Sequence, residues 1–173
     1  MTIRLILARL YAACGGLAAV FLMGVCLCSL YSIGASIFGY VARSIDEFAG
    51  YSMASSSFLA LAYTFGRGEH IRVTLLLEKL PEGGRRWAEL WCLAAGAFLS
   101  GFLAFYTVKM TYTSWALHDM SQGLVPMELW IPQIGMAVGT TVLFVAVLEK
   151  LVDVAMGGEP VRVPDPHDAH VDR

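Results

Sequence analysis

Charged residues are scarce in this chain of 173 residues, because Asp, Glu, Lys and Arg together make up 15% of it, whereas 57% of the residues are hydrophobic. This balance excludes an ordinary soluble domain, in which about a quarter of the residues are charged. The net charge is only -2, and the basic residues form no stripe or tail that could neutralise a phosphate backbone. The composition therefore predicts a membrane protein and excludes a nucleic-acid partner.

Histidine and cysteine are also few, and their positions favour no metal or haem site. The histidines lie outside the long apolar runs, so no pair of them can ligate a haem inside a helical bundle. They are His70, His118, His167 and His170. The cysteines lie inside apolar runs, where a thiol behaves as a small hydrophobic residue. They are Cys14, Cys26, Cys28 and Cys92. We therefore expect no cofactor, no metal and no catalytic residue.

Long uncharged runs are the main feature that the sequence does contain. They cover residues 10–38, 48–65, 90–108 and 129–148. Each has about 18 residues or more, which is enough to cross a hydrocarbon core of roughly 30 Å. The first run is too long for a cleaved signal peptide, so we expect it to stay in the membrane. The sequence predicts an all-α integral membrane protein with four transmembrane helices.

The expected domain organisation is simple. The four helices should cover about 10–38, 46–66, 87–115 and 129–152, within one transmembrane domain over residues 1–155. The remaining residues, 156–173, are rich in proline, glycine and charge. Such a segment buries too little apolar surface to offset the entropy of ordering it. We expect it to be a flexible cytoplasmic tail.

The distribution of lysine and arginine predicts the orientation. Four crossings would place both termini and the connection over residues 66–89 on one side of the membrane. Ten of the twelve basic residues would lie on that side, and only Arg43 and Lys109 on the other. The positive-inside rule then places both termini in the cytoplasm, as in a multi-pass protein of the bacterial inner membrane.

The connection between the second and third runs has amphipathic character. Ile71, Leu75 and Leu76 can share one helical face, with charged residues on the other. This pattern predicts a short helix lying at the cytoplasmic membrane interface. His70 begins this pattern without a second metal ligand nearby, so we interpret it as an interfacial hydrogen-bonding residue.

Three local motifs predict helix boundaries and contacts. Ser44 and Glu47 have the spacing of a capping box at the start of the second helix. Gly135 and Gly139 form a G-x-x-x-G pattern, which suits either packing within the chain or a seam for a partner. The serines at 55–57 are expected to bond to the preceding turn or to a neighbouring helix, with an ion site as the alternative.

Several short motifs resemble a known transporter family. The stretch over residues 43–51, RSIDEFAGY, is followed by an apolar run and then by GEHIRV at residues 68–73. Leu80-Pro81 and the later Leu129-Trp-Ile-Pro-Gln133 follow in the same order. Together they resemble the small permease subunit of tripartite ATP-independent periplasmic (TRAP) transporters, the DctQ-like family. The resemblance covers nearly the whole chain apart from the tail.

The resemblance implies a role and a set of partners. In this family a periplasmic binding protein delivers a solute, usually a carboxylate, to a large and a small membrane subunit driven by a sodium gradient. The large subunit carries the substrate and sodium sites, so the resemblance implies a scaffolding subunit with lipid, the large permease and the binding protein as partners. Acidic residues open the second helix in the family. Candidate partner contacts are thus Asp46, Glu47, His70 and Arg72.

Two other functions fit the same spans. A channel or a membrane enzyme would need polar residues converging at mid-depth, which the apolar runs lack. A structural anchor subunit of another inner-membrane complex would fit the four helices equally well. The sequence does not identify the solute, because the residues that select it lie on other chains.

Overall fold

The computed structural model describes residues 2–40, 44–66, 82–123 and 125–156. These residues form helices α1 (Thr2–Ile37), α2 (Ile45–Gly66), α4 (Glu82–Leu117) and α5 (Trp130–Ala155). The predicted all-α class is confirmed for this part of the chain. The interfacial helix and the tail that the sequence predicts fall mainly on residues 67–81 and 157–173, which lie outside the described residues.

Three of the four helices are long and apolar enough to cross a membrane. They are α1 over Leu5–Ile37, α4 over Trp87–Leu117 and α5 over Trp130–Ala155. The chain is therefore a helical membrane protein. Helix α2 is not among the three, because two acidic residues open it and several serines lower its hydropathy. Its 22 residues would still extend over about 33 Å, which matches a hydrocarbon core in length.

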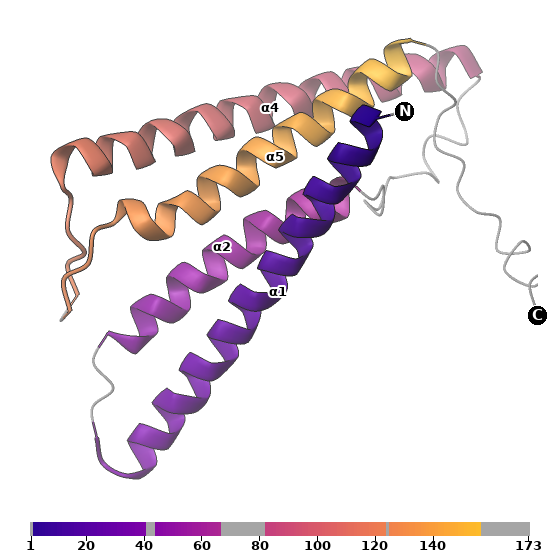
Figure 1. Ribbon diagram of the computed structural model, residues 1–173. Helices are drawn as coiled ribbons and strands as arrows, with labels where there is room; N and C mark the ends of the chain where they lie inside the picture. Colours follow the sequence, from indigo (N-terminus) through magenta and orange to yellow (C-terminus); the bar gives the residue numbers. More distant parts are fainter. Residues whose placement is uncertain (1, 41–43, 67–81, 124, 157–173) are drawn as a thin grey trace, which may run out of the picture.

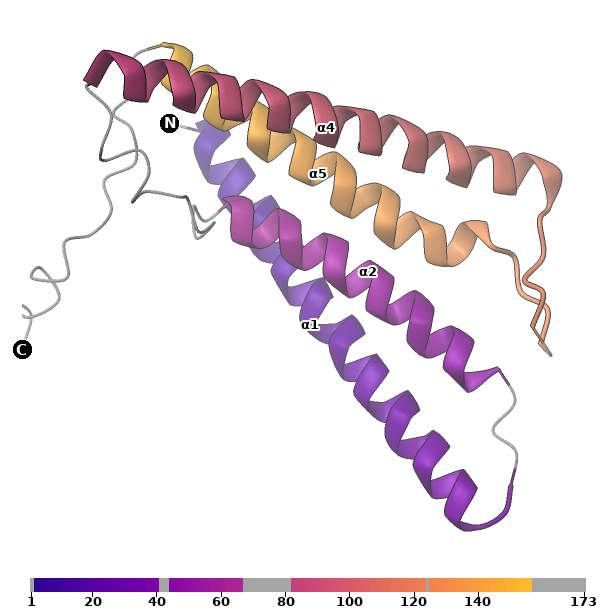
Figure 2. The same cartoon turned by 180° about the vertical axis from the view of Figure 1, so that it is seen from behind.

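The helices lie in the order α1, α2, α5, α4 (Figure 1). Helix α2 packs against α1 on one side and α5 on the other, and α4 packs mainly against α5. Both views show α1 diverging from α5 towards the α1–α2 connection (Figures 1 and 2). We call the end that carries the α1–α2 and α4–α5 connections the hairpin end. The opposite end, where α1 begins and α5 ends, is the terminal end.

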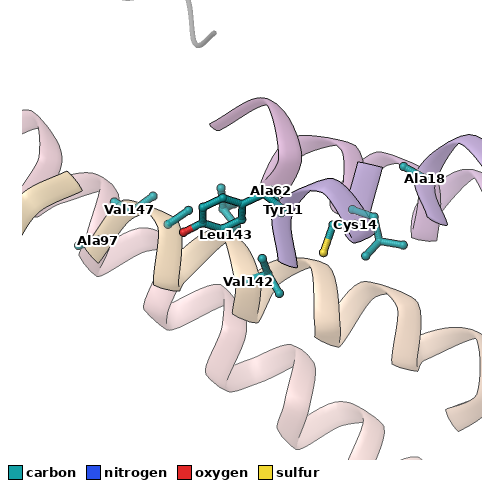
Figure 3. Close-up of a cluster of buried hydrophobic side chains, with 10 residues drawn as sticks. Tyr11, Cys14, Ala18, Ala62, Ala97, Val142, Leu143 and Val147 are labelled. Atoms are coloured by element: carbon teal, nitrogen blue, oxygen red, sulfur yellow. The ribbon is translucent and has the colours of Figure 1, made fainter. Parts of the chain in front are cut away.

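Small side chains line the contacts between helices. The buried cluster includes Ala18 on α1, Ala62 on α2 and Ala97 on α4, which Figure 3 labels, together with Ala146 on α5. Without a hydrophobic driving force in lipid, helices associate through close van der Waals packing, which small residues permit. The core therefore follows the packing rule of membrane helices rather than that of a soluble bundle.

Glycines bring α5 against α2. A Cβ atom added at Gly139 would lie 2.7 Å from the backbone carbonyl carbon of Phe58, and one added at Gly135 would collide with the Ser55 side chain. The G-x-x-x-G pattern therefore serves packing within the chain, which was one of its two interpretations. At the α1–α2 contact, the ring of Tyr63 covers Gly15 in the same way.

Candidate partner-contact sites

The acidic pair expected to contact a partner lies in the first turn of α2, at the hairpin end. Asp46 is exposed, whereas Glu47 is half-buried. Within the described part of the chain, Asp46 has no ion-pair or hydrogen-bonding partner for its carboxylate. The two adjacent residues are thus placed differently: Glu47 bonds to the α4–α5 connection, whereas the Asp46 carboxylate is exposed and unpaired among the described residues.

The predicted capping box at the start of α2 is wrong. Ser44 adopts a left-handed backbone conformation with φ of 59°. Its Oγ accepts a hydrogen bond of 3.0 Å from the backbone N–H of Val125, in the α4–α5 connection. The carboxylate of Glu47 accepts one of 3.1 Å from Ser121 Oγ in that same connection. Both side chains therefore form hydrogen bonds with the α4–α5 connection. Neither bonds to the backbone of the other, as a capping box would require.

The Glu47 contact depends on a glycine. The backbone N–H of Gly123 donates a 3.2 Å hydrogen bond to Ser121 Oγ, which orients that hydroxyl. A Cβ atom at Gly123 would collide with the Glu47 carboxylate. A larger residue at position 123 would therefore displace the Glu47 carboxylate from this position. Ser44, Glu47, Ser121, Gly123 and Val125 form one tie between the connections, which we call the hairpin tie.

The α4–α5 connection is itself ordered by local bonds. Met120 and Glu128 form an isolated antiparallel bridge, and Leu129 N–H donates a 3.0 Å hydrogen bond to Asp119 O. The carboxylate of Glu128 accepts a hydrogen bond from Trp130 Nε1 and lies 3.8 Å from His118 Nδ1. The connection therefore holds a defined shape against which α2 begins.

The other two predicted contact residues, His70 and Arg72, lie outside the described residues.

A second polar contact, at the terminal end, was missed by sequence reasoning. Tyr11 on α1 donates a 2.7 Å hydrogen bond to the carboxylate of Glu149 on α5. The pair borders a cavity of about 500 Å³ between α1, α2 and α5, which Lys150 and Asp153 also line. Glu149 directly follows the apolar run over residues 129–148, and nothing local in the sequence relates it to Tyr11.

Hydroxyl groups between the helices bond within the chain. Ser56 Oγ donates a hydrogen bond of 2.9 Å to Ala18 O, and Ser55 Oγ donates one of 3.4 Å to Pro132 O. The buried hydroxyls of Thr107 and Thr140 lie 2.8 Å apart and join α4 to α5. The predicted bonding of the serines to the preceding turn or to a neighbouring helix is confirmed, and it gives these hydroxyls a structural role.

No group of three or more His, Cys, Asp or Glu side chains that could hold a metal ion occurs within the described ranges.

Comparison with known proteins identifies the family. The family described as "Tripartite ATP-independent periplasmic transporters, DctQ component" matches residues 25–157 of the chain. This segment includes all of α2, α4 and α5 and the hairpin tie. No curated protein matches the chain. The resemblance found in the short motifs is thus confirmed over most of the sequence, and the chain belongs to the DctQ component family of the tripartite ATP-independent periplasmic transporters.

Proposed function

We propose that this chain is the small membrane subunit that scaffolds the large permease subunit of a TRAP transporter. The transporter would take up a carboxylate-type solute that a periplasmic binding protein delivers, driven by a sodium gradient. The family match over residues 25–157 carries this proposal. The hydroxyls of Ser56, Thr107 and Thr140 support it, because they stabilise helix contacts within the chain.

The proposed topology has four crossings with both termini in the cytoplasm. Helix α2 lies between α1 and α5, so its neighbours shield Ser55 and Ser56 from lipid. A helix covered in this way tolerates polar side chains that an isolated span would not. The excess of basic residues at the terminal end supports a cytoplasmic position for that end. The hairpin end, with Asp46 and the hairpin tie, would then face the periplasm.

The acidic pair takes two roles in this proposal. Asp46 would contribute charge to a contact with a periplasmic or membrane partner, which affects association rate more than folding. Glu47 would hold the two connections together through Ser121, and so fix the surface on which Asp46 stands. His70 and Arg72 remain candidate contacts on the cytoplasmic side.

Co-purification with the large subunit tests this function. An affinity tag on this chain should recover its large permease subunit from membranes solubilised in mild detergent. The same tag on an unrelated four-helix membrane protein is the control. Recovery of redox or other enzyme subunits, with no large permease, would instead support an anchor subunit of another complex.

A further inference from the structure

Two opposite faces of α4 carry the same seven-residue spacing. Leu93, Ser100, Thr107 and Ser114 are all buried, at 9%, 7%, 6% and 5% exposure, and lie on the face towards α5. Trp91, Phe98, Phe105 and Tyr112 repeat with the same spacing and are 79%, 72%, 64% and 64% exposed. The two sets are offset by two residues, about 200° around the helix, so they lie on opposite faces. Helix α4 therefore has one face covered by α5 and one exposed face with the same repeat, which we call the open seam.

The open seam is extended by two further aromatic residues on the same face. Trp87 and Phe102 are 77% and 57% exposed. A seven-residue repeat keeps a helix face aligned with a second helix over several turns, whereas lipid chains require no such register. Aromatic residues are also enriched where protein surfaces meet. We call Trp87, Trp91, Phe98, Phe102, Phe105 and Tyr112 the aromatic stripe.

The outer surface of α1 provides the contrast within the same molecule. Its exposed large residues in the middle of the helix are mostly aliphatic and are distributed around the helix. They include Leu17, Val20, Leu22, Met23, Leu27 and Leu30. Aliphatic side chains match lipid tails and need no partner. The composition of the exposed side chains therefore differs between the two helices: that of α1 suits lipid, whereas that of the open seam on α4 suits a second helix.

Lys109 lies on the aromatic stripe. It follows Phe105 by four residues on the exposed face of α4, and no carboxylate in the described part of the chain pairs with it. It is six residues from Trp115, about 9 Å along the axis, and directly follows the apolar run over residues 90–108, so it lies near the hairpin end of the helix. A lysine there can extend its ammonium group towards the membrane interface, and because Lys109 has no ion-pair partner among the described residues, its charge is available to a carboxylate of a partner helix.

A groove continues the stripe onto α5. It has a volume of about 580 Å³ and is lined by apolar side chains of both helices, among them Tyr112, Trp115, Trp130 and Ile134. Tyr112 belongs both to the stripe and to this groove. A large apolar side chain from a helix lying on the stripe would fit there.

We propose that the aromatic stripe is the surface on which a transmembrane helix of the large permease subunit packs, with a carboxylate of that helix opposite Lys109. This inference rests on the proposed function and names the face of this chain that performs it. The hairpin end and α1 would then remain available to the binding protein and to lipid.

Site-specific photocrosslinking tests the inference in the assembled complex. A photoreactive phenylalanine analogue replaces Phe98 or Phe105 on the stripe and, as the matched control, Val20 or Leu27 on α1. The stripe positions should give adducts with the large subunit in clear excess over the α1 positions. Adducts mainly from α1, only with a second copy of this chain, or only with lipid would overturn it. If the large subunit never co-purifies, the proposed function fails before this question arises.

Substitution of Lys109 tests the carboxylate separately. Loss of this ion pair in Lys109→Gln should reduce recovery of the large subunit by about tenfold, which corresponds to about 1.4 kcal/mol. Lys109→Arg keeps the charge and should recover most of the complex. Equal recovery with the Gln variant would overturn the proposed carboxylate partner.

Discussion

Tyr11 of α1 and Glu149 of α5 are joined by a hydrogen bond of 2.7 Å, although 138 residues separate them in the chain. The two helices make few other contacts and diverge towards the hairpin end (Figure 1). Helix α1 packs mainly against α2, so this bond adds a direct link from α1 to α5 at the terminal end. The ring of Tyr11 also covers Gly66 at the end of α2, so one side chain links three helices.

Replacing Tyr11 with Phe should lower stability while preserving the packing of the ring. Loss of the hydroxyl removes the hydrogen bond to Glu149, which should lower the free energy of unfolding by about 1 kcal/mol. The measurement is the midpoint of thermal unfolding in detergent. Tyr31→Phe is the matched control, because Tyr31 lies on the same helix and is 61% exposed. Equal midpoints for the two variants would show that the bond contributes nothing.

The hairpin tie predicts energetic coupling between Glu47 and Ser121. In a double-mutant cycle with Glu47→Ala and Ser121→Ala, the coupling free energy should be about 1 kcal/mol, because each variant breaks the same hydrogen bond. The cycle is measured by chemical unfolding in detergent. Additive effects would contradict the tie.

Substitution of Asp46 distinguishes a role in local stability from a role in partner contact. Asp46→Asn should lower the free energy of unfolding by less than about 1 kcal/mol, because the Asp46 carboxylate has no partner within the described residues and interacts only with the N-terminal end of the helix dipole. It should slow association with the partner and weaken its salt dependence. Glu47→Gln should instead lower membrane abundance. Normal uptake and normal partner association with Asp46→Asn would reject the contact role of this residue.

The α2–α5 contact predicts opposite effects for two Gly→Ala substitutions. At Gly139 the new methyl group meets the backbone of Phe58, and overpacking of this kind costs about 1 to 3 kcal/mol. At Gly34 nothing lies within 4 Å of the new Cβ. Gly34→Ala should therefore be neutral or stabilising by about 0.5 to 1 kcal/mol. Unfolding midpoints that fall equally for both variants would contradict the packing at Gly139.

Reporter fusions test the proposed crossings, α2 included. Alkaline phosphatase, which is active only in the periplasm, should be active when fused after Tyr40, inactive after Glu82 and active after Ser121. Equal activity after Tyr40 and Glu82 would mean that α2 does not cross the membrane. The fully reversed pattern would refute the orientation while keeping four crossings.

The helical class and the family follow from features that a sequence displays directly. Apolar runs predict membrane helices because the bilayer requires about 20 apolar residues per crossing. The family was predictable because short motifs, such as the one around Asp46, occur in the same order as in the family. The bonding of Ser56 to a neighbouring helix was also predictable, because a hydroxyl between membrane helices has few other partners.

Contacts between distant segments were not predictable in the same way. Ser44 and Glu47 have capping-box spacing, yet the α4–α5 connection lies within reach and offers Val125 N–H and Ser121 Oγ instead. Local spacing contains no information on what folds beside it. The Tyr11–Glu149 bond was unpredictable for the same reason, because it depends on how α1 is placed relative to α5 in the folded chain.

Uptake by purified components in liposomes tests the central claim most directly. With the large subunit, this chain and the cognate solute-binding protein present, an inward sodium gradient should drive accumulation of the carboxylate that the binding protein carries. Removing this chain should abolish accumulation, and this chain alone should accumulate nothing. Full uptake without this chain, or uptake by this chain alone, would contradict its assignment as the scaffolding subunit.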